Sequence, residues 1–596
     1  MNEGYNYRYE KQYRDLDRGY TIFNTILTAK VKLPFNINYS LNFAPRFQWY
    51  RNRYWLSSQH PVWSTQHNGY VDREHREKFD WVISNVINWE YTFAKKHTVN
   101  VTLSQEAEEH KNWKTVVEAR DFTPTDALGF HYIDAANKTK SKFTSEDTHS
   151  TGDALLARLF YSFDSRYMTT LSVRRDGYSA FGTSNPRAVF ASAAFAWTFT
   201  SEKFFNWNAM NHGKLRASWG SNGNRGIGIY TALSNLTTGT GSYAYVDSNG
   251  ALKEISQLFV SRMANPSLRW ERTTSWNYGL DLGFLNSRIN GSIDYYHMPT
   301  TDLIMNQSIP QITGFSSITT NLGEVLNKGF EFTLNTVNVQ NKNFEWNSTF
   351  NFSLNRNKIV HLYYTYEQVL DDNGNVIGMK EKDDRGNKWF IGKDINEIWD
   401  YKLLGIWQED EAEEAALYKQ VPGDPKVLDV YDVEKHAYSN DDKVFLGSKS
   451  PKFRWSFRND FTFLQNFTAS MNIYSNWGQK ATTTGYINTG YAAERYNQYV
   501  TKYWTPENPT NKYARLGATN RATDAPRILD RSFIRLESIS LEYNVPKKIL
   551  AKHNISNLRL TGSVRNVAVW TKEEWYTDPQ YSYVPRTFSF GASLTF

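Results

Sequence analysis

The last ten residues of the chain alternate strictly between two kinds of side chain. Large apolar residues and one alanine occupy every second position from Phe588 to Phe596, while Thr, Ser and Gly fill the positions between them. Successive side chains of a strand point to opposite faces. This period of two therefore predicts a β-strand with one apolar face and one small or polar face.

The same alternation recurs in about 17 segments from residue 20 onward. It is clearest at 273–284 and 289–297, which the short segment 285–288 joins. Other tight turns are predicted at 94–96, 164–166, 340–343 and 465–466. Long polar stretches separate the hairpins, at roughly 44–80, 105–153, 222–272, 298–327, 358–452 and 478–532.

Short and long connections alternate in this pattern, as they do in an antiparallel transmembrane β-barrel with short periplasmic turns and long extracellular loops. An all-β barrel of this kind is therefore the predicted fold, with the apolar faces toward lipid. About 17 strands is an odd number, whereas bacterial barrels usually have an even number. Residues 1–596 are accordingly expected to form one incomplete barrel domain, with further strands upstream.

The composition is compatible with this fold. No run of 18 apolar residues exists, so the sequence predicts no transmembrane helix. Aromatic residues make up 16% of the chain, which suits aromatic girdles at two membrane interfaces or a sugar-binding surface. Cysteine is absent, which excludes zinc–thiolate sites, disulfides and cysteine nucleophiles. The net charge of +7 is spread along the chain and predicts no nucleic-acid partner.

Several segments resemble the carboxy-terminal half of the SusC/RagA-type TonB-dependent outer-membrane transporters of Bacteroidetes. The resemblance covers about residues 150–596. The segments that carry it are Arg158–Gly177, Lys214–Gly223, Asn265–Tyr296, Thr300–Leu303, Asn321–Leu334, Ser532–Pro546, Asn557–Val567 and Asp578–Gln580.

The resemblance implies a bacterial outer-membrane importer of large oligosaccharides or peptides, without enzymatic activity or a cofactor. It implies a barrel of about 22 strands preceded by a plug domain, so the plug and the first strands are expected to lie outside residues 1–596. The implied partners are a SusD-like surface lipoprotein that acts as a lid, the TonB–ExbB–ExbD complex acting through the plug, the barrel-assembly machinery and outer-membrane lipid.

Acidic residues after Gly423 are weak candidates for a calcium site. Related transporters often carry an Asp-x-Asn-x-Asp-Gly motif here, but Tyr431 and Val433 occupy its Asn and Gly positions. A calcium loop needs that oxygen ligand and that turn, so solvated loop acids are the favoured interpretation. The candidates are Asp424, Asp429, Asp432, Asp441 and Asp442.

Aromatic residues in the long loops are candidates for stacking on a sugar or packing against a lid protein, although such rings also fill loop cores. The set carried forward as substrate contacts is Trp55, Trp63, Trp399, Trp407, Tyr491 and Trp504.

Other chemistry-bearing residues receive structural interpretations. The segment Gly220–Gly228 looks like a phosphate loop, but no helix follows it, which favours a flexible loop. Glu106, Glu108 and Glu109 are expected to be solvated charges, because nothing fixes two carboxylates at a glycosidase spacing.

Two alternatives remain open. A soluble all-β carbohydrate-binding or carbohydrate-active protein would have to bury the apolar strand faces against a second sheet. An outer-membrane enzyme would need a catalytic constellation, and the spacing of residues supports none.

The terminal strand is also expected to be the assembly signal, through Phe588, Phe590, Leu594 and Phe596. By the resemblance, insertion machinery reads an amphipathic carboxy-terminal strand that ends in an aromatic residue. Deleting Phe596 should therefore lower the amount of protein inserted in outer membranes, measured by heat-modifiable gel mobility, and leave total synthesis unchanged. Normal insertion of the deletion variant would refute this role.

Overall fold

The computed structural model describes residues 7–596 apart from 61–67, 124, 240–243, 255–256, 372, 484–501, 519–522, 524, 552–554, 574, 576–577 and 581–583. Its residues fall into two compact units. Unit 1 comprises Met1–Phe195, Trp219–Thr274 and Thr300–Gly323, and unit 2 comprises Ala196–Ser218, Ser275–Pro299 and Glu324–Phe596.

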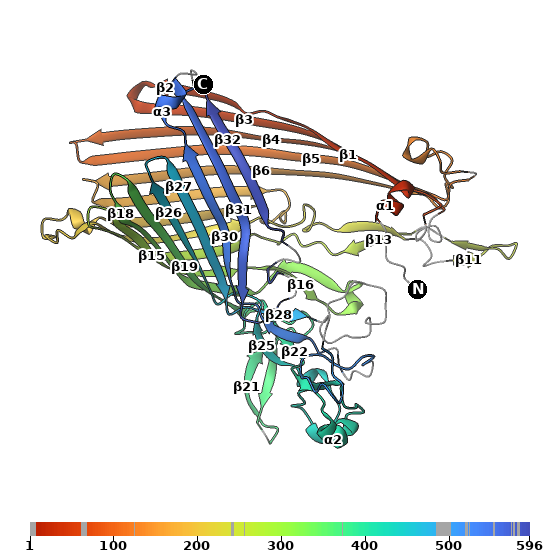
Figure 1. The fold of residues 1–596 in the computed structure, drawn as a ribbon. Coiled ribbons are helices and arrows are strands. Elements are labelled where there is room, and N and C mark those ends of the chain that lie inside the picture. Colours follow the sequence, from red (N-terminus) through yellow and green to blue (C-terminus); the bar gives the residue numbers. More distant parts are fainter. Residues whose placement is uncertain are drawn as a thin grey trace. The chain divides into compact units, whose positions relative to one another are not determined.

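Unit 1 is built on an antiparallel meander in which consecutive strands pair (Figure 1). Two short strands, β1 and β2, lie end to end along β3, because β1 pairs with Arg46–Leu56 and β2 with Ile37–Phe43. Strands β3 to β7 then follow in chain order. Their bounds are β1 Arg14–Asn24, β2 Leu27–Leu33, β3 Ile37–Leu56, β4 Tyr70–Phe93, β5 His97–Arg120, β6 Lys142–Phe163 and β7 Tyr167–Tyr178.

Unit 2 contains a second antiparallel meander, β18 to β32, again paired in chain order. Its strands are β18 Glu324–Gln340, β19 Phe344–His361, β26 Phe453–Phe463, β27 Phe467–Trp477, β30 Phe533–Asn544, β31 Asn557–Thr571 and β32 Thr587–Thr595. Four strands have residues in both units: β8 Arg187–Trp197, β9 Met210–Asn224, β14 Glu271–Phe284 and β15 Ile289–Thr301.

The long connections carry small two-stranded sheets and short helices. The paired strands are β10 Asn235–Gly239 with β13 Gln257–Arg262, β11 Ala244–Val246 with β12 Leu252–Glu254, β16 Ile304–Ser308 with β17 Ser317–Asn321, β20 Tyr366–Leu370 with β21 Val376–Glu381, β22 Glu397–Asp400 with β25 Val444–Ser448, β23 Leu403–Ile406 with β24 Pro425–Val427, and β28 Lys480–Thr483 with β29 Arg527–Asp530. The α-helices are α1 Tyr7–Glu10, α2 Ala412–Leu417 and α3 Lys547–Leu550. The 3₁₀ helices are η1 Lys11–Tyr13, η2 Pro34–Asn36, η3 Gly129–His131, η4 Phe199–Ser201, η5 Gln311–Thr313, η6 Glu409–Glu411, η7 Val433–Lys435 and η8 Asn440–Asp442.

The predicted tight turns occur where the alternation stops. At the β4–β5 turn, Ala94 and Lys95 have φ of 50° and 59°, and at the β6–β7 turn, Asp164 and Ser165 have φ of 53° and 55°. Turns with positive φ at both central positions match the twist of the flanking strands. The other turns, at 285–288, 341–343 and 464–466, also lie where they are predicted.

The apolar side chains of the meanders are exposed. In unit 1, Ile87 and Leu103 lie opposite each other on β4 and β5 with 43% and 47% of their surface accessible. In unit 2, Leu541 and Phe590 are 48% and 89% exposed. Water would penalise an apolar face of this kind on every strand. The predicted contact with lipid removes that penalty.

Buried apolar clusters lie instead among the long connections and the strand ends beside them. One in unit 1 contains Val71, Phe122 and Phe130, and one in unit 2 contains Ile406 and Trp504. These clusters hold the loops together. Within the described residues, the strand faces thus lack the second sheet that the soluble alternative requires.

Strands β3 to β6 are longer than the sequence pattern predicts. The stretches 44–80 and 105–153 are expected to be mainly loop, yet β4 and β5 remain paired from Tyr70–Arg120 to Phe93–His97. Beyond the apolar region both faces carry polar side chains, so hydrophobic alternation disappears while backbone pairing continues. Cross-strand contacts such as Trp81 Nε1 donating to Glu109 Oε2 at 2.8 Å support the extension.

The fold class is confirmed as antiparallel β-sheet. Within the described residues eighteen strands belong to extended sheet, and because β1 and β2 share one position along β3, they fill seventeen positions, the predicted number. No helix in this part of the chain is long and apolar enough to span a membrane.

The exposed apolar face generates a direct test. Leu171 on β7 is 47% exposed, and Thr170 points to the other face. Leu171→Arg should lower the free energy of unfolding in bilayers by about 2–4 kcal/mol, because it places a charge against hydrocarbon. Thr170→Arg is the control and should cost much less. Equal unfolding midpoints for the two variants in a denaturant titration would contradict the lipid-facing assignment.

Candidate functional site

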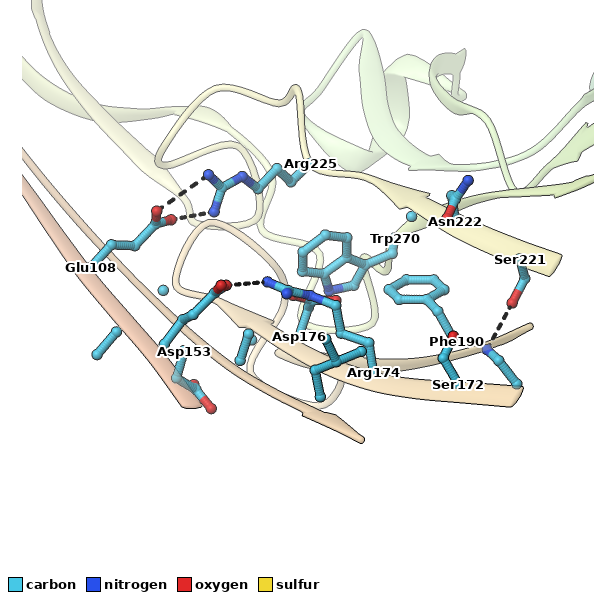
Figure 2. Close-up of a pocket in the computed structure, with 18 of the residues that line it drawn as sticks. Glu108, Asp153, Ser172, Arg174, Asp176, Phe190, Ser221, Asn222, Arg225 and Trp270 are labelled. Carbon is cyan, nitrogen blue, oxygen red and sulfur yellow. Dashed lines mark hydrogen bonds and ion pairs between the residues drawn. The ribbon is translucent and has the colours of Figure 1, made fainter. Parts of the chain in front are cut away.

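A cavity of about 520 Å³ lies in unit 1 on the polar face of β5 to β9 (Figure 2). Alternation places its side chains on one face, because residues two apart on a strand point the same way. The segment that follows β9 and the residue before β14 complete its wall. The lining residues used below are Glu106, Glu108, Gly152, Asp153, Arg174, Asp176, Phe190, Gly223, Arg225 and Trp270.

Arg174 is held between two carboxylates at the bottom of the cavity. Its Nη2 donates to Glu106 Oε2 at 2.6 Å, and its Nε donates to Asp176 Oδ1 at 2.7 Å. Glu106 lies on β5, whereas the other two residues lie on β7, so the contacts reach across β6. These bonds fix the guanidinium plane.

Gly152 on β6 makes room for a second charged contact. A Cβ at this position would lie 2.6 Å from Glu108 Oε1. In its absence the Glu108 carboxylate crosses β6 and forms an ion pair with Arg225. Arg225 also lies over the Tyr178 ring, with 5.3 Å between its Cζ and the ring centroid.

Trp270 forms the aromatic side of the cavity and is 7% exposed. Its ring stacks on Phe181 at 4.6 Å between centroids and meets the edge of Phe190 at 5.9 Å. A Cβ on Gly223 would lie 2.2 Å from Phe190 Cζ, so this packing requires glycine. Without a side chain at Gly223, β9 passes close to the rings of Phe190 and Trp270.

The indole Nε1 of Trp270 is buried and has no hydrogen-bond partner among the described residues. Figure 2 shows the indole beside Arg174 and Asp176. A buried donor without an acceptor costs roughly 1–3 kcal/mol. The indole N–H is thus a buried donor beside the cavity, whereas the guanidinium groups and carboxylates supply its polar lining.

The arrangement suits binding. Three carboxylates face the cavity, from Glu106, Glu108 and Asp176, against the two guanidinium groups of Arg174 and Arg225, so acidic groups exceed basic ones by one. The Asp153 carboxylate lies on the other face of β6, where it pairs with Arg187 at 2.8 Å. A hydroxyl can donate to a carboxylate and accept from a guanidinium or indole N–H. Neutral hydroxyl-rich ligands therefore fit this wall better than polyanions.

The sequence analysis missed this site. Glu106 and Glu108 are interpreted there as solvated charges, whereas the structure pairs both with arginines. The Gly220–Gly228 segment is a loop from residue 225 onward, as predicted, and it contributes Arg225. Same-face spacing on β7 marks Arg174 and Asp176, but only the register of β5, β6 and β7 brings the four charges together.

The predicted substrate-contacting aromatics are mostly packed inside loops. Trp399, Trp407 and Trp504 are 7%, 1% and 7% exposed. Trp407 Nε1 donates to Gln420 Oε1 at 2.9 Å, and Trp55 packs against the unit 1 cluster that contains Phe130. Ligand contact by these rings stays a prediction and requires the loops to open. Trp63 and Tyr491 lie outside the described residues.

Three of the five calcium candidates lie in separate contacts with basic side chains. Asp424 Oδ1 accepts from Arg515 Nε at 3.0 Å, Asp441 Oδ1 pairs with Arg385 at 2.6 Å, and Asp432 pairs with Lys435. Among the described residues no three His, Asp or Glu side chains gather where they could hold a metal ion.

Asp442 is fully buried and lies beside Asp429 in the same loop. Asp442 accepts hydrogen bonds from the backbone N–H groups of Ser439, Tyr431 and Val430 at 2.7, 2.8 and 3.0 Å. Burial opposes ionisation, but these bonds outweigh it and lower the pKa of Asp442. Burial and then the Asp442 carboxylate raise the pKa of Asp429. The hydrogen bonds to Asp442 therefore stabilise the loop.

The proposed assembly residues lie on β32 or, for Phe596, directly after it. Phe588, Phe590, Leu594 and Phe596 are 63%, 89%, 44% and 84% exposed. Their accessible apolar face is the surface that the assembly role requires, and the role itself stays a prediction.

Comparison with known proteins gives consistent results. Residues 2–567 match the model of the family described as TonB dependent receptor-like, beta-barrel. The chain is 30% identical over 549 residues to TonB-dependent receptor P26 of Formosa agariphila, covering 87% of this chain and 53% of the relative. It is 32% identical over 281 residues to TonB-dependent receptor SusC of Bacteroides thetaiotaomicron, covering 41% of this chain and 28% of SusC.

Among solved structures, the RagAB peptide transporter superposes with a TM-score of 0.80 at 20% identity, over 99% of this chain and 63% of the other. This likeness concerns the fold. The chain spans about half the length of P26 and of the similar receptor P39, at 53% and 55%.

The Asp442 contacts predict how the loop responds to pH. Because the folded-state pKa lies below the ordinary value of 3.8, the stabilisation is complete above pH 3.8 and is lost as pH falls through the lowered pKa. Asp442→Asn should cost the loop about 1–3 kcal/mol at pH 7, seen as faster hydrogen exchange in 425–448.

Asp441→Asn is the matched control. It removes a neighbouring exposed ion pair, which contributes little. Unchanged exchange in Asp442→Asn at pH 7 would show that the buried carboxylate does not hold the loop.

Proposed function

The chain belongs to the family of TonB-dependent receptor-like β-barrels, and on this premise we propose that it forms the wall of an outer-membrane transporter. The transporter imports a large nutrient, and an oligosaccharide is the first candidate. The family consists of outer-membrane receptors and transporters rather than enzymes, as the sequence predicts. The observation that carries the proposal is the division of the same strands into an exposed apolar face and a face with a charged cavity.

In this proposal the wall itself is passive. Its apolar face rests against lipid, and its polar face lines the pore. The moving plug and the remaining strands lie outside residues 1–596, in keeping with relatives about twice as long. TonB, driven by ExbB and ExbD, acts on that plug, and a SusD-like lipoprotein covers the outer opening. The barrel-assembly machinery inserts the wall by reading β32.

The chemistry of the cavity supports an oligosaccharide as the ligand. Paired carboxylates and guanidinium groups present acceptors and donors side by side. Vicinal hydroxyls of a sugar can satisfy both kinds of group. A peptide, the ligand class named for the RagAB transporter, is the alternative arm of the test.

Substitution of Arg174 tests the proposal. Arg174→Gln frees the Glu106 and Asp176 carboxylates from their shared partner, and uptake should fall by about tenfold, the effect of one charge-assisted contact. Arg158→Gln is the control. It also removes one positive charge from the polar face of the sheet, but on β6 and outside the cavity, and this variant should transport normally.

Uptake by cells is measured with fluorescently labelled neutral oligosaccharides, acidic oligosaccharides and mixed peptides. Neutral oligosaccharides should be imported and should show the Arg174 effect. If only peptides are imported, the ligand is a peptide and not an oligosaccharide. If the Arg174→Gln variant takes up every imported probe at the wild-type rate, the cavity has no role in transport.

A further inference from the structure

A cluster of basic side chains lies in unit 1, on the face of β3 and β4 that carries the exposed apolar residues. The cluster consists of Arg51 and Arg53 on β3 and Arg73 and His75 on β4. They line a cleft of about 330 Å³ together with Asn52, Glu74, Thr115, Val117 and Ile133. Glu74 is itself paired with Arg76 at 2.5 Å.

Strand register places one pair of like charges, Arg53 and Arg73, directly opposite each other. Arg51 lies opposite His75, and Arg53 lies opposite Arg73. Like charges at facing positions destabilise a sheet. Asp17 on β1 is shared between Arg51, at 3.1 Å, and Arg53, so one carboxylate serves two guanidinium groups.

The remaining contacts leave donors available. Arg73 is exposed and makes no hydrogen bond or ion pair with any described residue. The Arg53 guanidinium lies over the Phe130 ring, with 5.3 Å between Cζ and the centroid, and its Nε is buried. His75 has one acidic neighbour, Glu77, at 3.5 Å. The cleft therefore has more donors than the chain itself uses.

The position of the cluster indicates what the donors meet. On the same face of β3 and β4, Phe47 and Phe79 stack at 4.6 Å between centroids, and Phe47 stacks on Trp49 at 6.0 Å. These three residues form an aromatic band of the kind that marks a membrane–water interface. Arg51 is the next same-face residue after Trp49, about 7 Å farther along the strand.

The basic cluster thus begins where the hydrocarbon contact ends, at the end of β3 and β4 nearest their longer connection, 57–69. Guanidinium groups bind phosphate through paired hydrogen bonds. A molecule that contacts both the aromatic band and the basic cluster needs acyl chains and a phosphorylated headgroup.

We propose that Arg51, Arg53, Arg73 and His75 form a binding site for the phosphate groups of an outer-leaflet phosphoglycolipid. Its acyl chains lie along the apolar face below the aromatic band. Its phosphate neutralises the facing positive charges of β3 and β4, so bound lipid also stabilises this end of the sheet. The site is separate from the cavity around Arg174 and does not depend on which nutrient is imported.

The test measures lipid retained by the native complex purified from outer membranes. The double variant Arg51→Gln/Arg73→Gln leaves the Arg53–Asp17 pair intact and should retain about tenfold less phosphoglycolipid by mass spectrometry. Arg51→Lys/Arg73→Lys should restore much of it, because the charge returns. Lys78→Gln removes one charge from the opposite face of β4 and should retain wild-type amounts.

Heat-modifiable gel mobility verifies that each variant is folded. Complexes stripped of lipid are then offered vesicles containing lipid A, vesicles containing lipid A with its phosphates removed, or inorganic phosphate alone. Wild type should retain only the phosphorylated lipid. Equal retention of the dephosphorylated lipid, or wild-type retention by the double glutamine variant, would overturn the proposal. Binding of inorganic phosphate without preferential lipid retention would assign the cluster to a soluble anion and also overturn it.

Discussion

Backbone hydrogen bonding between neighbouring strands is the constraint on which the rest of this molecule depends. A strand in hydrocarbon has no water to satisfy its N–H and C=O groups, so each must pair with another strand. β4 meets this demand in unbroken register, with β5 along its whole length and with β3 from Tyr70 to Trp89. The same pairing decides which side chains share a face, and so it places the apolar surface, the charged cavity and the basic cluster at once.

Much of the fold can be predicted from the sequence because two local signals are strong. Alternation marks the strands wherever one face is apolar, and the tight turns lie where it stops. The outer halves of β3 to β6 could not be found in this way, since both of their faces are polar and the period-two signal is lost. Their pairing shows only when positions such as Trp81 and Glu109 are brought together.

The candidate site could not be predicted for a related reason. Glu106, Arg174 and Arg225 are far apart in the chain, and each looks like a surface charge by itself. Register makes them neighbours, and Gly152 and Gly223 provide the space. The loop tryptophans show the opposite case. Aromatic residues in polar loops suggest ligand contact, yet Trp407 and Trp504 pack into loop cores. An aromatic ring stabilises buried contacts as readily as it binds a sugar.

Contact between the exposed apolar face and hydrocarbon can be measured by spin labelling, since the chain has no cysteine of its own. Single cysteines introduced along 99–104 of β5 would carry nitroxide labels in membranes, and their collisions with oxygen and with a water-soluble nickel chelate would be compared. The account predicts that Val99, Val101 and Leu103 favour oxygen, while the alternate positions favour the chelate. Loss of this period of two, with the apolar positions either open to the chelate or closed to both reagents, would contradict it.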